Sequence, residues 1–421
     1  MPGLLRRKRK VAAVNRNPGY LKLELAIRGL RLDESARRRT DVFRAPWVRD
    51  YVTRHVELLL PEDLWVSVPL EEAFTERSPF LLVAEGGRFF LAREGEKVEV
   101  RPLPQPAFYE KTTRRGTPMW RVATVYGGFV AVNPAAACGF SLRGVPCKFC
   151  EIGTKGLPDS AFALRVEEVV EVVREAFAEG AAEFVYFNTG YFDTDDGGIE
   201  FLEPYIRAVK RHFDTFVAVQ VHPPRQNHWI DRTYAIGVDA LSYNVEIHDP
   251  EILSRYCQGR VKYIGRDRYY EALEYAARIF PSGTVWSDLI VGLEPPESTM
   301  RGIDALTSIG VLPVLSLFRP LDETQLRDHP LPRVEDVAPV YAHLFHAVRR
   351  ARINMGWVRD LSFGVTPLEA RFFAGDEARM AVAVQQFYRT KLGTVAARNL
   401  SRLRRRLRVR RVSDSFDSSR L

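Results

Sequence analysis

Between Val122 and Arg350 the sequence alternates short apolar runs, typical of buried strands, with amphipathic runs, typical of helices. Strands are expected at 127–132, 183–188, 215–221, 239–245, 285–291 and 312–318, and helices at 166–179, 201–213, 229–236, 269–279, 298–309 and 334–350. Six strand–helix units predict an α/β fold with a parallel sheet, either rolled into a barrel or left open and doubly wound. Both architectures place their chemistry at the carboxyl ends of the strands.

Three of the four cysteines follow the first predicted strand, at Cys138, Cys147 and Cys150. A disulfide would leave one of them unpaired, and nothing in the sequence indicates an oxidising compartment, so a metal site is favoured. Four thiolates would close a cluster or a zinc tetrahedron, whereas three leave one metal position open for a substrate or cofactor. The alternative is a structural zinc site closed by Cys257 or a histidine, although zinc ribbons normally bring two Cys-x2-Cys pairs.

This loop resembles the cluster loop of the radical S-adenosylmethionine (SAM) enzymes, Cys-x3-Cys-x2-Cys with an aromatic residue before the last cysteine. Cys147-Lys148-Phe149-Cys150 matches the second half, including the aromatic Phe149, whereas the first gap is eight residues instead of three. The resemblance implies a [4Fe-4S] cluster on Cys138, Cys147 and Cys150 that cleaves SAM reductively to a 5'-deoxyadenosyl radical. It also implies a partial (β/α)6 TIM-type barrel and an electron donor such as reduced flavodoxin or ferredoxin.

Two later strand ends extend the resemblance. Asn188-Thr189-Gly190 lies where the family has a glycine-rich turn that receives the methionine amino group, although the usual Gly-Gly-Glu is absent. After the fourth strand, Asn244 and Glu246 resemble the ribose-binding segment of biotin synthase-type members. Each position has an ordinary structural alternative, but their order along the chain matches the family.

The fifth strand and the helix before it add two further matches. Ile290 and Gly292 resemble the segment that contacts adenine, with Gly292 allowing close approach of the backbone. Arg266 or Arg268 stands where these members place the arginine that binds the methionine carboxylate. All these residues therefore become candidates for cofactor binding.

The substrate is expected over the mouth of the barrel. His222, after the third strand, is a candidate acid–base group or a loop hydrogen-bonder. Arg319, after the sixth strand, would suit a carboxylate or phosphate on the substrate. Cys257 is expected to be a buried, inert thiol, with a substrate-facing or ligand role as the alternative.

The regions outside the barrel divide the chain into three predicted parts. Residues 1–117 form an accessory region with a small hairpin at 79–84 and 88–92 and a third strand at 97–101. Residues 118–350 form the core barrel, and residues 351–421 form a helical, basic C-terminal extension that ends in an arginine-rich tail. Residues 102–115 are expected to be a linker.

The net charge of +8 is concentrated at the two ends of the chain, which leaves the body slightly acidic. Basic ends are usually solvated tails, so an RNA substrate is possible but not favoured. No apolar run approaches the ~20 residues of a membrane span, and the protein is expected to be cytoplasmic.

With three thiols on one cluster, a second all-cysteine cluster is excluded. We therefore expect a radical SAM enzyme that abstracts hydrogen from a small-molecule substrate, leading to rearrangement, dehydrogenation, carbon–carbon bond formation or fragmentation. The alternatives are a radical SAM enzyme that modifies RNA and a zinc-stabilised binding module.

Overall fold

The computed structural model describes residues 17–39, 55–135, 137–151, 163–355, 364–375 and Leu403. Its larger sheet has eight strands in the order β14-β13-β12-β11-β10-β9-β8-β7. The strands are β7 (Thr124–Tyr126), β8 (Phe129–Val132), β9 (Phe184–Asn188), β10 (Val217–Gln220), β11 (Ala240–Ser242), β12 (Val285–Val291), β13 (Leu312–Leu317) and β14 (Gly364–Val365). Strands β8 to β13 run parallel in chain order, and β7 and β14 add antiparallel edges.

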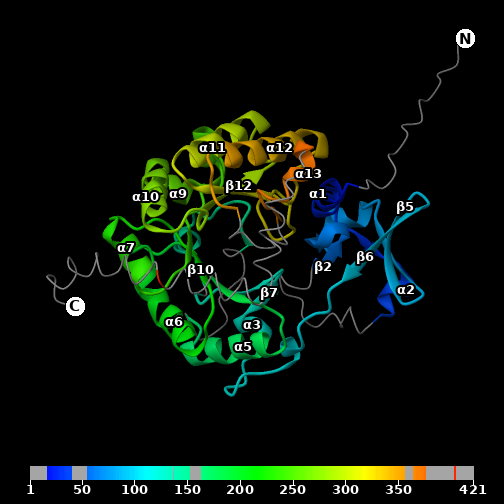
Figure 1. Ribbon diagram of the computed structural model, residues 1–421, viewed down its shortest axis with the longest axis horizontal. Helices are drawn as coiled ribbons and strands as arrows, with labels where there is room; N and C mark the ends of the chain where they lie inside the picture. Colours follow the sequence, from blue (N-terminus) through cyan, green and yellow to red (C-terminus); the bar gives the residue numbers. More distant parts are fainter. Residues whose placement is uncertain are drawn as a thin grey trace, which may run out of the picture.

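This sheet curls into a partial barrel, with helices following one another around its outside (Figure 1). The helices are α5 (Val166–Ala178), α6 (Ile199–His212), α7 (His228–Ala235), α10 (Arg266–Ile279), α11 (Pro296–Ser308) and α12 (Val334–Arg350). The predicted six-unit α/β barrel is confirmed, and each expected strand and helix is present with boundaries shifted by a few residues.

The two faces of the sheet differ because side chains alternate along a strand. Val185, Phe187 and Leu289 are fully buried in the main apolar core that the helices cover. The alternate positions include Tyr186 and Asp288, which are half-buried. The inner face of the barrel is therefore partly polar, as a binding chamber requires.

Strand β11 is shorter than the predicted strand at 239–245. The chain turns after Ser242, and Glu246 adopts the left-handed conformation with φ 67°. Two helices that were not predicted follow, α8 (Pro250–Tyr256) and α9 (Gln258–Tyr263). Asp249 caps α8 by accepting hydrogen bonds from the backbone of Glu251 and Ile252, a cap signal that the sequence carries.

The N-terminal region forms a second sheet with the strand order β1-β4-β5-β6-β2-β3. Its strands are β1 (Arg31–Leu32), β2 (His55–Leu60), β3 (Leu64–Pro69), β4 (Leu81–Glu85), β5 (Arg88–Arg93) and β6 (Glu96–Pro102). The predicted hairpin corresponds to β4 and β5, and the predicted third strand to β6. The sheet also includes β1, β2 and β3, which were not predicted.

Helix α1 (Pro18–Arg28) lies beside the C-terminal end of the described chain, next to α12 and α13 (Arg371–Ala374) (Figure 1). Lys22 Nζ lies 2.9 Å from Glu369 Oε2, and both side chains are buried. Asn17 Nδ2 donates a hydrogen bond of 2.9 Å to the carbonyl oxygen of Phe372. The expected division at residues 117 and 350 remains a prediction.

The expected linker is partly packed: it contains a 3-10 helix, Ala107–Glu110, whose Phe108 and Tyr109 are buried. Among the described residues, no helix has the length and apolarity needed to cross a membrane. The arginine-rich segment at 402–421 lies outside the described residues apart from Leu403.

Candidate active site

The cysteine loop begins at the carboxyl end of β8 and packs against the turn that follows β9. Cys138 Sγ accepts a hydrogen bond of 3.3 Å from the backbone N–H of Tyr191, and Gly139 N donates to the Tyr191 carbonyl at 2.8 Å. A Cβ at Gly190 would lie only 2.6 Å from both Cα and Cβ of Cys138. Glycine is thus required for this approach, and the predicted turn touches the cysteine loop.

The second half of the loop is held by the junction of α8 and α9. Lys148 N donates to the carbonyl of Tyr256 at 2.9 Å. Immediately beside this bond, Cys147 packs against the small buried apolar cluster that contains Cys257. Hydrogen bonding by Cys257 and the charge of the nearby Arg260 lower the pKa of Cys147 to about 7, whereas burial raises the pKa of Cys257.

Arg260, in α9, connects the cysteine loop to the predicted ribose-binding residues. Its buried guanidinium places Nε 3.4 Å from Cys147 Sγ and donates from Nη2 to Glu246 Oε1 at 2.9 Å. Its Nη1 donates to the carbonyl oxygen of Asn244 and lies 3.4 Å from Tyr269 Oη. Sequence reasoning missed Arg260 because helix α9 was not predicted.

Glu246 is buried with a backbone conformation that is unfavourable for a residue with a side chain. Its N–H donates to the carbonyl of Asp288 at 2.9 Å, and its carbonyl accepts from Ile290 N at 2.7 Å. Burial raises the pKa of Glu246, against the opposing effects of Arg260 and of a hydrogen bond with the Asn244 side chain. Such locally strained residues concentrate at functional sites.

The predicted adenine-contacting segment also meets the cysteine loop. Ile290 is buried in a small apolar cluster with Cys257, and Cys147 and Phe149 pack against that cluster. Gly292 has φ 103°, and a Cβ there would lie 2.5 Å from Pro332 Cγ. The backbone at Gly292 therefore lies close to Pro332, in the segment that precedes α12.

The two arginines that were predicted to bind the methionine carboxylate, Arg266 and Arg268, have partners elsewhere. Arg266 donates from Nε to the carbonyl of His248 at 3.2 Å, and its Nη2 lies 3.2 Å from His248 Nδ1. Arg268 donates to the carbonyl of Pro224 and to Asn227 Oδ1, both at 2.8 Å. Arg260, in contrast, contacts a cysteine of the loop, with Nε 3.4 Å from Cys147 Sγ.

His222 is buried beside the cysteine loop rather than open to solvent. Its Nδ1 lies 2.7 Å from Tyr269 Oη, and its ring meets that of Phe140 edge-on at 5.0 Å. Burial lowers the pKa of His222 well below its ordinary value, so the ring is neutral at pH 7. A neutral imidazole is suited to accept a proton or a hydrogen bond.

Two side chains just after strands and one within β12 have buried atoms without a hydrogen-bond partner among the described residues: Thr189 Oγ1, Arg319 Nη1 and Asp288 Oδ1. Asp288 Oδ2 accepts from Ser316 Oγ at 3.0 Å, and burial raises the pKa of Asp288 to about 7, aided by the charge of Glu246. Buried polar groups are rarely left unpaired, so a bound ligand would account for them. Asp288 was not predicted as a site residue, although a carboxylate within an otherwise apolar strand could have indicated one from the sequence.

The three cysteines of the loop suit an iron–sulfur cluster by the chemistry of their sulfur donors. The thiols of Cys138 and Cys147 contact different partners, Tyr191 N and Arg260 Nε. Within the described parts of the chain, no group of three His, Cys, Asp or Glu side chains is spaced to hold a metal ion. Cluster binding on Cys138, Cys147 and Cys150 thus requires their side chains to turn toward one another.

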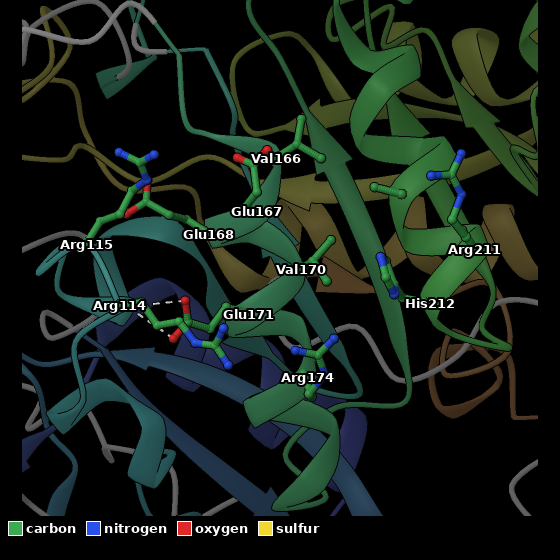
Figure 2. A pocket seen from close by; sticks show the side chains of 11 residues that line it. Arg114, Arg115, Val166, Glu167, Glu168, Val170, Glu171, Arg174, Arg211 and His212 are labelled. Carbon is green, nitrogen blue, oxygen red and sulfur yellow. Dashed lines mark hydrogen bonds between the residues drawn. The ribbon is translucent and has the colours of Figure 1, made fainter.

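A charged groove of about 470 Å³ lies outside the sheet, lined by the loop at 114–115 and by α5 and α6 (Figure 2). Arg114 N donates to the carboxylate of Glu171 at 3.2 Å, and Arg174 and Arg211 also line the groove. None of the predicted site residues lines it. The candidate active site is therefore the set of strand ends around the cysteine loop.

Residues 132–304 match the family described as the radical SAM superfamily. This region begins at the end of β8, contains the cysteine loop, and extends through β12 into α11. This part of the chain is a radical SAM domain, of the kind that enzymes of this superfamily carry, as the sequence pattern predicted. The family implies a [4Fe-4S] cluster and SAM as cofactors.

One similar curated protein is bacteriochlorophyllide c C-7(1)-hydroxylase from Chlorobaculum limnaeum, 22% identical over 120 residues. The match spans 28% of this chain and 30% of the length of that relative. It identifies no reaction for this chain.

Similar solved structures include methylornithine synthase, with 15% identity, a TM-score of 0.44, and coverage of 60% of this chain and 70% of that one. The hydrogenase maturase HydG from Carboxydothermus hydrogenoformans has 16% identity, a TM-score of 0.42, and coverage of 54% and 52%. A radical SAM methyltransferase from Sphaerobacter thermophilus has 16% identity, a TM-score of 0.35, and coverage of 66% and 78%. Because these TM-scores lie below 0.5, the class of this chain rests on the family match.

Proposed function

We propose that this chain is a radical SAM enzyme that holds a [4Fe-4S] cluster on Cys138, Cys147 and Cys150 and abstracts a hydrogen atom from a small-molecule substrate. When bound, the cluster and SAM supply the electron and the adenosyl radical for that step. The observation that carries the proposal is the buried contact chain from Cys147 through Arg260 to Glu246. It joins the cluster loop to a predicted cofactor residue far from it in the sequence.

The cofactor pocket is proposed to lie between three strand ends. The Asn188-Thr189-Gly190 turn would receive the methionine amino group, since it packs against Cys138. Asn244 and Glu246 would bind the ribose hydroxyls, and Ile290 would pack on adenine. Gly292 lets the chain after β12 approach Pro332. We propose Arg260 as a third candidate, beside Arg266 and Arg268, for binding the methionine carboxylate.

The substrate is proposed to enter the polar inner face of the barrel. Among the described residues, the buried Nη1 of Arg319 has no hydrogen-bond partner, so it would suit a carboxylate or phosphate on the substrate. The neutral His222 would act in hydrogen bonding or proton transfer. An electron donor such as reduced flavodoxin or ferredoxin completes the proposed reaction.

The RNA-modifying and zinc-binding alternatives have less support. None of the relatives named above is described as acting on RNA or binding zinc. The tail that suggested RNA lies outside the described residues. We therefore favour the small-molecule substrate.

The experiment is equilibrium binding of SAM to anaerobically reconstituted protein, comparing wild type, Glu246→Gln and Glu251→Gln. Glu251 is an exposed carboxylate on α8 and serves as the matched control. We expect wild-type and Glu251→Gln to bind alike and Glu246→Gln to bind roughly tenfold more weakly, since losing a hydrogen bond with a charged group costs about 1.5 kcal/mol. Absence of measurable SAM binding to the wild-type protein would refute the pocket.

A further inference from the structure

Cys257 has no role in the proposed cluster, yet Cys147 packs against the small buried cluster that contains it. The two residues are 110 positions apart, and the backbone bond from Lys148 N to the Tyr256 carbonyl, 2.9 Å long, lies directly beside both. Cys257 is fully buried, whereas Cys147 is half-buried. The structure thus brings a half-buried cysteine against a fully buried one.

The backbone around the pair is held on both sides. Cys257 N donates to the carbonyl of Leu253 at 2.7 Å, and the Cys257 carbonyl accepts from Arg260 N at 3.0 Å. A Cβ at Gly259 would lie 2.7 Å from the carbonyl oxygen of Val145 and 2.6 Å from the ring of Phe140. The α8–α9 junction therefore packs directly on the cysteine loop, and little backbone movement is available to separate the two thiols.

We propose that Cys147 and Cys257 form a reversible disulfide in the chain when it holds no cluster. This inference rests on the proposed function only in naming Cys147 as a cluster ligand. Thiols that are already in contact can be joined without the backbone movement that more distant cysteines need. The disulfide would remove Cys147 from the ligand set, so that cluster assembly requires prior reduction.

The oxidant is a small disulfide such as oxidised glutathione. Cys147 is the less buried of the two residues. Its sulfur loses its proton and attacks one sulfur of that molecule, forming a mixed disulfide and releasing one glutathione thiolate. The Cys257 sulfur then loses its proton and attacks the Cys147 sulfur, releasing a second glutathione. The two protons return to the two leaving thiolates, so two protein thiols are oxidised and one oxidised glutathione becomes two reduced molecules.

The test exposes the cluster-free full chain to oxidised glutathione without oxygen, blocks the remaining thiols by alkylation, and maps the peptides by mass spectrometry. We expect two of the four thiols to be lost in wild type, with Cys147 linked to Cys257. Cys257→Ser should instead leave Cys147 joined to glutathione, and Cys138→Ser should keep the Cys147–Cys257 link. The proposal is wrong if Cys147 pairs with Cys138 or Cys150, stays reduced, or stops at the mixed disulfide in wild type.

A second measurement separates this proposal from the cluster assignment. After oxidation, wild type should take up roughly tenfold less iron than after treatment with dithiothreitol, because an oxidised cysteine cannot act as a ligand. Iron uptake by the reduced chain without any Cys147–Cys257 link would refute the disulfide and keep the proposed function. A Cys147–Cys257 link without iron uptake by the reduced chain would support the disulfide and refute the proposed cluster.

Discussion

Arg260 Nε lies 3.4 Å from Cys147 Sγ, at the point where helix α9 meets the cysteine loop. The same side chain donates to Glu246, so a single buried cation contacts both a predicted cluster ligand and a predicted cofactor residue. An arginine remains charged at every relevant pH and cannot neutralise itself by losing a proton. Its removal would leave the buried carboxylate of Glu246 without its ion-pair partner.

Arg260→Gln should therefore lower the free energy of unfolding by about 3 kcal/mol, the usual cost of breaking a buried ion pair. It should also weaken SAM binding by the reconstituted protein. Arg266→Gln is the comparison variant, since Arg266 is the competing candidate for the methionine carboxylate and its side chain is 30% exposed. Urea unfolding and SAM binding of both variants measure the two effects. A larger loss of SAM affinity in Arg266→Gln than in Arg260→Gln would restore Arg266 as the carboxylate-binding residue.

Gly190→Ala should disturb the cysteine loop, because the added methyl group would meet the backbone Cα of Cys138 at 2.6 Å. Over-packing of this kind costs about 1–3 kcal/mol, and here the displaced residue is a proposed ligand. We expect lower iron content after reconstitution as well as lower stability. Gly128→Ala is the control, since nothing lies within 4 Å of a Cβ at that position. Equal iron content in the two variants would show that the Gly190 contact does not support the loop.

Asp288 should make the folded protein less stable as pH rises. The pKa of its buried carboxyl is raised to about 7 from an ordinary 3.8, with the charge of Glu246 adding to the effect of burial. A folded state with the higher pKa binds the proton more tightly than the unfolded chain, so this contribution is present at low pH and is lost between about pH 4 and pH 7. Asp288→Asn should remove this part of the pH dependence.

The measurement is the denaturant midpoint of wild type and Asp288→Asn at pH 5 and pH 8. The decrease in unfolding free energy between these pH values should be about 2 kcal/mol larger in wild type, by the linkage between pKa and stability. Glu246 is present in both proteins, so its titration contributes about equally to the pH dependence of their unfolding free energies. Parallel pH profiles would show that Asp288 does not titrate in this range.

The barrel could be predicted because its strands bury one face under amphipathic helices, which leaves a clear periodicity in the sequence. The cysteine loop and the strand-end matches could be predicted because short motifs fix their spacing. The loop, the turn at Gly190 and the segment at Ile290 indeed come together. Their roles in binding the cluster and SAM stay predictions.

Other parts of the site could not be predicted, for physical reasons. Arg260 lies in a short helix whose position depends on tertiary packing against the cysteine loop, and a sequence window does not carry that information. Cys147 packs against the cluster that contains Cys257, and only the fold brings these distant residues together. The edge strands β7 and β14 are two or three residues long and too short to show a pattern.

The central claim is that Cys138, Cys147 and Cys150 hold the cluster, and iron and sulfide analysis of the anaerobically reconstituted, fully reduced protein tests it most directly. Wild type and Cys257→Ser should each contain about four irons and four sulfides per chain, whereas serine at Cys138, Cys147 or Cys150 should remove most of both. Cys257→Ser is the matched control because it deletes a thiol in contact with the loop but outside the proposed ligand set. One tightly bound zinc and no iron in the wild-type protein, or loss of the cluster only in Cys257→Ser, would contradict the assignment.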